Sequence, residues 1–184
     1  MESFYIKSQK DAFILLEKLS VSKSLISHHK IVLQTAEEML NQLPISIKNS
    51  IDSNLVMIGA SIHDIGKVLF PNEESEPGSF HELAGKRLLL SLGIPLEISR
   101  FSMIHSTKIQ SSTIEEIVVR LADVIWTGSR DFESELALAY RLSIKLEINF
   151  WYLFSQLNEI FDNESDKCFR RYKNHLLENK ILVR

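Results

Sequence analysis

The chain has 184 residues and a mass of 21.2 kDa, which is enough for one folded domain with a sizeable core. Hydrophobic residues make up 45% and charged residues 24%, a balance that excludes an intrinsically disordered chain. The formal net charge is -3 and the pI is about 6.1, so the overall charge favours neither a nucleic-acid backbone nor an anionic membrane. Any phosphate-bearing ligand must therefore be bound by a local site.

Cysteine usage and the N-terminal segment indicate a cellular location. The single cysteine, Cys168, excludes an intramolecular disulfide and a thiolate metal cluster, and it favours a reducing compartment. Residues 1–10 lack the long apolar stretch of a signal peptide, and the apolar runs elsewhere are too short to cross a bilayer. We expect a cytoplasmic protein with no membrane or nucleic-acid partner.

The pattern of apolar residues predicts an all-α fold. Apolar residues recur every three or four positions along most of the chain, while glycine and proline are scarce. The predicted helices, bounded by capping residues or by proline and glycine, are about 9–19, 22–43, 53–64, 79–92, 95–105, 113–128, 131–146, 149–161 and 165–182. The expected caps at helix starts include Ser22, Asp52 or Ser53, and Thr113 with Glu116. We interpret residues 1–184 as a single domain of packed helices, with a motif-bearing core of about 22–130 and a helical C-terminal extension of about 131–184.

Two further segments lead to local predictions. Residues 70–79 (FPNEESEPGS) are typical of a loop, and we expect this loop to rim the functional site. Ser79 followed by Glu82 matches a capping box at the start of the next helix. The basic run 170–173 (RRYK) is typical of an exposed helix face, and His175 beside it is typical of a solvated side chain.

The chemistry of the chain is suggested first by His63 and Asp64, an adjacent pair that follows an apolar helix. Adjacent residues on a helix point about 100° apart, so both side chains can reach one ion only where the helix ends, and Gly66 is the expected end. Imidazole and carboxylate together are typical ligands of manganese, iron and zinc. A buried histidine beside an aspartate that caps a turn would produce the same dipeptide.

The longer string 63–67 (HDIGK), with the apolar residues 57–62 before it, resembles the HD superfamily of metal-dependent phosphohydrolases. The resemblance implies an HD-domain helical bundle with additional C-terminal helices. The pattern of that superfamily is a histidine, then a His-Asp pair, then a distant aspartate. His28 matches the first histidine and Asp123 matches the last aspartate. His29 lies on the same helical turn and remains an alternative to His28.

The resemblance extends to the binuclear subgroup, because His81 and His105 lie between the pair and the last aspartate. It implies two divalent transition metals, with iron or manganese first and zinc, cobalt or magnesium as further options. The implied ligands are His28, His63, Asp64, His81, His105 and Asp123. In this scheme Asp64 bridges the two ions. His28, His63 and Asp123 hold one ion, and His81 and His105 hold the second. A surface role is the alternative for His81 and His105.

Lys67 comes directly after the His-Asp pair and is the predicted phosphate partner, since a lysine is a compact point charge. An ordinary exposed lysine is the alternative. Asp64 and Lys67 are the expected catalytic residues. Trp126, Gly128 and Arg130 follow the last ligand, and we expect them to frame the mouth of the pocket, with Arg130 binding a substrate phosphate.

The function implied by the resemblance is hydrolysis of a phosphate ester or anhydride in a nucleotide or other small phosphorylated metabolite, through a metal-activated hydroxide. The chain has no glycine-rich phosphate loop, which argues against a kinase or an ATPase. The ligand set is similar to that of the symmetrical dinucleoside tetraphosphate hydrolases, which makes such a nucleotide the first choice of substrate. The segment 63–85 is also similar to the cyclic-di-GMP phosphodiesterases, but their Gly-Tyr-Pro tripeptide is missing after His105.

Two other functions share the same residues. Some relatives use the two-metal site as a mixed-valent di-iron oxygenase, and others could keep the fold as a non-catalytic metal-binding sensor. The sequence leaves the exact substrate, the native metal and the oligomeric state open, a homodimer included.

Overall fold

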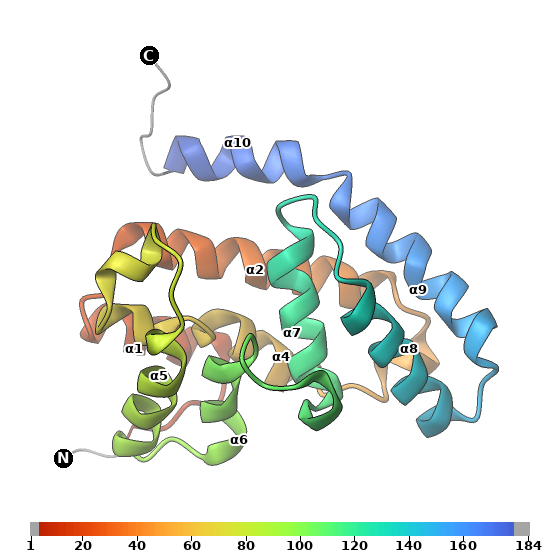
Figure 1. The fold of residues 1–184 in the computed structure, drawn as a ribbon, viewed down its shortest axis with the longest axis horizontal. Coiled ribbons are helices and arrows are strands. Elements are labelled where there is room, and N and C mark those ends of the chain that lie inside the picture. The colour runs from red at the N-terminus through yellow and green to blue at the C-terminus, as the bar shows by residue number, and fades with distance from the viewer. Residues whose placement is uncertain (1–3, 179–184) are drawn as a thin grey trace.

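The computed structural model describes residues 4–178, with side chains up to residue 173, and every regular element in this part of the chain is helical (Figure 1). The all-α prediction is therefore confirmed. The α-helices are α1 (Gln9–Lys18), α2 (Lys23–Gln42), α3 (Ile45–Lys48), α4 (Ser53–Ile62), α5 (Phe80–Ser91), α6 (Leu96–Ser99), α7 (Ile114–Ile125), α8 (Phe132–Leu146), α9 (Phe150–Ser165) and α10 (Cys168–Glu178). The 3-10 helices are η1 (Ile65–Val68), η2 (Pro71–Glu74), η3 (Arg100–Met103) and η4 (Ile109–Ser111). Among these helices none combines the length and the apolarity that a bilayer crossing requires.

Several helix boundaries are fixed by the caps that the sequence predicts. The side chain of Ser22 accepts a hydrogen bond from the third residue of α2, and Asp52 does the same for α4. Thr113 and Glu116 form a complete capping box at the start of α7. Gly93, after α5, has a φ of 79°, a left-handed conformation that favours glycine at a helix end. Local sequence therefore determines where these helices begin and end.

α4 lies between two hydrophobic cores and places its C-terminal end inside the molecule. Val56, Met57 and Ala60 pack in a large core built mainly by α2, α7, α8 and α9. Ile58 and Ile62, on another face of α4, pack in a second core with residues of α1, α5 and α6. Because both sides of α4 are covered, the residues that follow its last turn are buried. In Figure 1, α7 crosses α2, and both helices contact α4.

The capping box predicted at Ser79 and Glu82 is wrong. The Ser79 side chain makes no capping hydrogen bond, although α5 does begin directly after it. The first amide groups of α5 instead donate to the carboxylate of Glu73, which comes from the preceding loop. Glu82 is buried and accepts a hydrogen bond from the amide of Ser106, at 2.7 Å, so its carboxylate is used in another part of the fold.

The helix predicted to run from Pro95 to His105 is much shorter than expected. Pro95 caps the four-residue helix α6, which continues into the 3-10 helix η3, and His105 lies in the turn after it. The backbone on both sides of His105 is bound by side chains from other helices. Arg120 donates to the carbonyl of Ile104 at 3.3 Å, and Glu82 accepts from the amide of Ser106. These bonds replace the helical ones and fix the turn that carries His105.

The basic run near the C-terminus is not uniformly exposed, which corrects the sequence-based interpretation. Arg171 is buried, and its guanidinium forms an ion pair with the fully buried Glu164 of α9. It also donates to Glu38 of α2 at 2.9 Å. These contacts attach α10 to α2, the helix along which it runs in Figure 1. The side chain of His175, which we expected to be solvated, lies outside the described residues.

We expect Arg171→Met to lower the free energy of unfolding by about 3 kcal/mol, because the substitution leaves the carboxylate of Glu164 buried without its main partner. Urea unfolding followed by circular dichroism measures this difference. The matched control is Arg170→Met, since the neighbouring Arg170 is 63% exposed and reaches Glu38 only at 4.0 Å. Equal losses in the two variants would contradict the assigned role of Arg171.

Candidate metal centre

Two carboxylates and two imidazoles from α2, α4 and α7 meet at the end of α4. The Nε2 atoms of His28 and His63 are 3.2 Å apart. Oδ1 of Asp123 lies 3.2 Å from His28 Nε2 and 3.5 Å from His63 Nε2. Oδ2 of Asp64 lies 3.5 Å and 3.8 Å from the same two nitrogen atoms. The structure thus brings together the residues that match the HD pattern.

The second oxygen of each carboxylate faces a further histidine. Oδ1 of Asp64 is 3.4 Å from Nε2 of His81, and Oδ2 of Asp123 is 3.4 Å from Nε2 of His105. The candidate ligand atoms of His63, His105 and Asp123 lie within 4.8 Å of one another, as do those of His28, His63 and Asp64. His81 therefore faces Asp64, whereas His105 faces Asp123.

Local backbone structure orients the His-Asp pair. His63 is the C-cap of α4, and its Nδ1 lies 3.2 Å from the carbonyl oxygen of Ala60, which leaves Nε2 facing the centre. Asp64 precedes η1, so the chain turns away from the α-helix at this residue.

Gly66 has a different role from the helix-ending one that the sequence suggested. A Cβ atom at position 66 would lie 1.9 Å from the carbonyl oxygen of His81 and 2.7 Å from the amide nitrogen of Gly85. Gly66 therefore allows α5 to pack directly against η1, and this close approach brings His81 to Asp64.

His28 and His29 have separate roles in the structure. The His28 ring faces the two carboxylates, whereas His29 is fully buried and accepts a hydrogen bond from the amide of Asp64 at 3.3 Å. Burial, together with the neighbouring histidines His63 and His28, holds the pKa of His29 well below its usual value. His29 thus remains neutral and supports the backbone of Asp64, while the ring of His28 faces the two carboxylates.

The electrostatics of the centre favour ionised carboxylates. Burial alone would lower the pKa of His28, but hydrogen bonds with Asp123 and Asp64 raise it to about 9. Burial opposes ionisation of Asp64 as well, but the nearby His63, with His28 and His81, holds the pKa of Asp64 well below its usual value. Hydrogen bonds with His28 and His63 similarly overcome burial and keep the pKa of Asp123 low. Both carboxylates are therefore ionised at neutral pH.

These residues fit a divalent metal. Oδ1 of Asp64 and Nε2 of His81 are buried, and within the described part of the chain neither atom has a hydrogen-bond partner. Buried polar atoms without a partner are uncommon and call for an explanation such as an ion. Imidazole nitrogen and carboxylate oxygen are suitable donors for first-row transition metals.

Glu73 supports His81 and was not identified from the sequence. Its Oε2 lies 2.5 Å from Nδ1 of His81 and 3.1 Å from the amide nitrogen of the same residue. A carboxylate on one ring nitrogen orients a histidine so that the other nitrogen can bind a metal. Glu73 lies in the segment 70–79, which we expected only to rim the site. The expectation that a metal-binding His81 needs a carboxylate on its second ring nitrogen is the signal that points to Glu73.

The mouth of the centre is a cavity of about 290 Å³. Its lining is mixed polar and apolar and consists of Ser24, Leu25, His28, Lys67, Glu74 and Trp126. Nζ of Lys67 is 2.5 Å from Oδ2 of Asp64, and the Trp126 ring meets the His28 ring edge-on with 5.9 Å between their centroids. Lys67 and Trp126 therefore lie where the sequence placed them, whereas Gly128 faces Cys168 and not the cavity.

The role predicted for Arg130 in phosphate binding is not supported by its contacts. Its guanidinium forms ion pairs with the buried Glu135 of α8 and with Asp162 of α9, and it donates to Asn158 at 2.9 Å. The ring of Phe161 packs against it at 5.7 Å. Arg130 is therefore occupied in joining α8 to α9, and its role in phosphate binding stays a prediction.

A comparison with protein-family models identifies the family to which the fold belongs. The model of the HD domain matches residues 25–127. The chain belongs to the HD-domain family. The matched segment contains all of the candidate ligands, from His28 to Asp123. Membership of this family supports a helical fold and a capacity to bind metal. Neither the curated proteins nor the solved structures gave a match.

We expect Glu73→Gln to weaken metal binding by about 10- to 100-fold, because His81 loses the carboxylate that orients its ring. Calorimetric titration of the metal-free protein with Mn²⁺ measures the affinity. Adding Glu73→Gln to His81→Ala should cause no further loss if Glu73 acts through His81. Glu76→Gln, in the same loop but exposed, is the control and should bind as the unmodified protein does. An unchanged affinity in Glu73→Gln would contradict the positioning role.

Proposed function

We propose that this HD-domain protein is a phosphohydrolase that uses two divalent transition metals to cleave a phosphate ester or anhydride in a nucleotide or other small phosphorylated metabolite. The observation that carries the proposal is the position of Asp64. One of its oxygens faces His28 and His63, and the other faces His81. A carboxylate with ligand groups on both sides is suited to bridging two ions.

The proposed ligands divide around this carboxylate. As the resemblance implies, His28, His63 and Asp123 would hold one ion and His81 and His105 the other, with Asp64 shared between the two. In the structure His105 lies beside Asp123 and His63, and it would reach the second ion from that side. Iron or manganese remains the first choice, with zinc, cobalt or magnesium as further options. Such ions would act as Lewis acids on the phosphoryl group and would lower the pKa of a bound water to about 7.

The residues at the mouth suit a phosphorylated ligand. Lys67 is 19% exposed in its side chain and lines the cavity beside Asp64, so its ammonium group can contact a phosphate that approaches the centre. The cavity of about 290 Å³ is at the lower end of the size range of small-molecule sites. It would hold the phosphate end of a nucleotide and leave the rest outside. A symmetrical dinucleoside tetraphosphate is the first substrate to test, and a cytoplasmic location remains our prediction.

We expect Lys67→Ala to reduce kcat/KM by about 10- to 100-fold, because the substrate loses a charge-assisted phosphate contact. Steady-state hydrolysis of the dinucleotide measures the change, and metal analysis of the same samples shows whether the ions are retained. Lys30→Ala on α2 is the control, since Lys30 is exposed. If both variants keep the parent activity, Lys67 is an ordinary surface lysine.

The choice between hydrolase and di-iron oxygenase depends on where the new oxygen atom originates, because both would use the same ligands. We expect the manganese-loaded protein to hydrolyse phosphate at equal rates with and without dioxygen, and to place oxygen-18 from labelled water in the product. Mass spectrometry of the product measures the incorporation. Asp64→Asn should abolish turnover, since the amide lacks the bridging charge. Activity that requires iron and dioxygen would establish the oxygenase, and metal binding without turnover would favour a sensor.

A further inference from the structure

A stripe of large apolar side chains is exposed along α8. Phe132 is 61% exposed, Leu136 43%, Tyr140 59% and Ile144 61%. These residues follow one another at intervals of four, so they share one side of the helix from its first turn to its last. Single exposed apolar residues are common, but a continuous row of them marks an interaction surface. The opposite side of α8 is buried in the large core through Leu138, among others.

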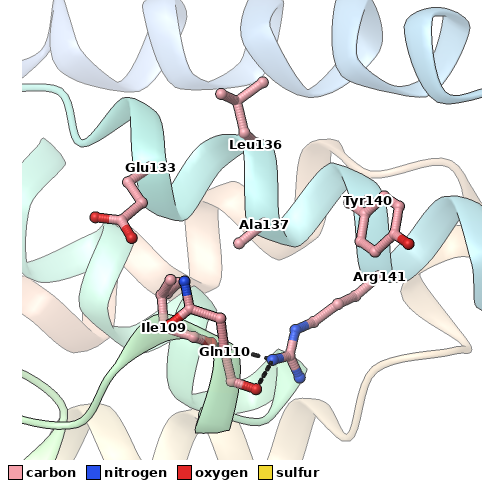
Figure 2. A pocket seen from close by; sticks show the side chains of 7 residues that line it. All are labelled: Ile109, Gln110, Glu133, Leu136, Ala137, Tyr140 and Arg141. Atoms are coloured by element: carbon pink, nitrogen blue, oxygen red, sulfur yellow. Dashed lines mark hydrogen bonds between the residues drawn. The ribbon is translucent and has the colours of Figure 1, made fainter.

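A groove of about 500 Å³ runs beside this stripe, between α8 and η4 (Figure 2). Its lining is mostly apolar and consists of Ile109, Gln110, Glu133, Leu136, Ala137, Tyr140 and Arg141. Arg141 donates to the carbonyl oxygens of Ile109 and Gln110 at 3.0 Å and 2.8 Å, as the dashed lines in Figure 2 show. These hydrogen bonds hold the two walls of the groove together, so the groove is a preformed feature.

The charges beside the stripe are arranged with opposite signs at its two ends. Figure 2 shows Glu133 and Arg141 at opposite ends of the groove, with the small side chain of Ala137 between them. Eight residues of helix separate the two charged residues by about 12 Å, which is too far for an ion pair within one chain. Glu133 is exposed and Arg141 is partly exposed, so a partner surface that carries the opposite charges in the reverse order could pair with both.

A second copy of the same helix meets these requirements. In an antiparallel pair of α8 helices related by a twofold axis near Ala137, Glu133 of each copy lies opposite Arg141 of the other. Phe132 and Leu136 of one copy then face Tyr140 and Ile144 of the other, and Ala137 allows the helices to approach closely. A twofold interface requires a surface that is complementary to itself, and this pattern of charge and apolarity has that property.

We propose that α8 and its groove form the interface of an antiparallel homodimer. This proposal rests on the surface of α8 alone and does not depend on the proposed hydrolase function. The cavity at the metal centre is lined by residues of α2, η1 and η2 and by Trp126 at the end of α7, and it is not part of this surface.

The first test is the mass of the protein in solution between about 1 and 100 µM, measured by sedimentation velocity. We expect a dimer for the unmodified protein and a monomer for Leu136→Glu, because a buried glutamate would have no partner in the interface. Leu90→Glu on α5 is the matched control, since Leu90 is 42% exposed, and it should remain dimeric. A monomer at every concentration of the unmodified protein, or a dimer that persists in Leu136→Glu, would overturn the proposal.

The second test uses the charges to identify the antiparallel arrangement. Glu133→Arg alone and Arg141→Glu alone should each raise the dimer dissociation constant by about tenfold or more, since like charges then face each other. An equimolar mixture of the two variants should form a heterodimer, because each altered charge meets an opposite one. Circular dichroism establishes that Arg141→Glu is folded, and Leu136→Glu tests the surface independently if it is not. Variants that dimerise alone as well as they do in the mixture would contradict the pairing.

Discussion

The structure depends on holding two ionised carboxylates side by side within a helical bundle. Asp64 is buried and the side chain of Asp123 is only 15% exposed, yet both keep a low pKa. Burying a charge is costly unless it is paired, and here the histidines of α2 and α4 supply the pairing. This pairing is possible because α4 lies between two hydrophobic cores, so the polar residues that follow its last turn are inside the bundle. A divalent cation would complete the charge balance of the same group of atoms.

A second layer of polar contacts holds the ligands in place. His29 binds the amide of Asp64, Glu73 binds the ring of His81, and Glu82 binds the backbone beside His105. Each of these contacts comes from a different element, so the ligand positions are fixed by the packed fold and not by any one helix. Metal sites with such support bind their ions more tightly than the ligands alone would. The same contacts explain how Asp64 and His105, which lie in turns outside the helices, can be held in place.

Sequence patterns were sufficient where the interactions are local. Ser22, Asp52 and the Thr113–Glu116 box determined helix starts through contacts three residues apart, and the HD pattern identified the aspartates and histidines that meet at the centre. They were insufficient where the partner is distant along the chain. Arg130 is bound by Asp162 and Asn158 of α9, and Arg171 is bound by Glu38 of α2. Their residue type alone suggested a phosphate ligand for Arg130 and an exposed face for Arg171. Gly66 similarly owes its role to the close packing of α5 against it, a contact that the local sequence does not reveal.

The central claim is that Asp64 is shared by two metal ions, one on the side of His28 and His63 and one on the side of His81. Anomalous X-ray diffraction from crystals of the manganese-loaded protein tests it most directly, because the positions of the ions are observed without reference to activity. The account predicts one anomalous peak bound by His28, His63 and Asp123 and a second by His81 and His105, with Asp64 contacting both. A single peak that leaves His81 and His105 unbound, or no peak among these residues, would contradict it.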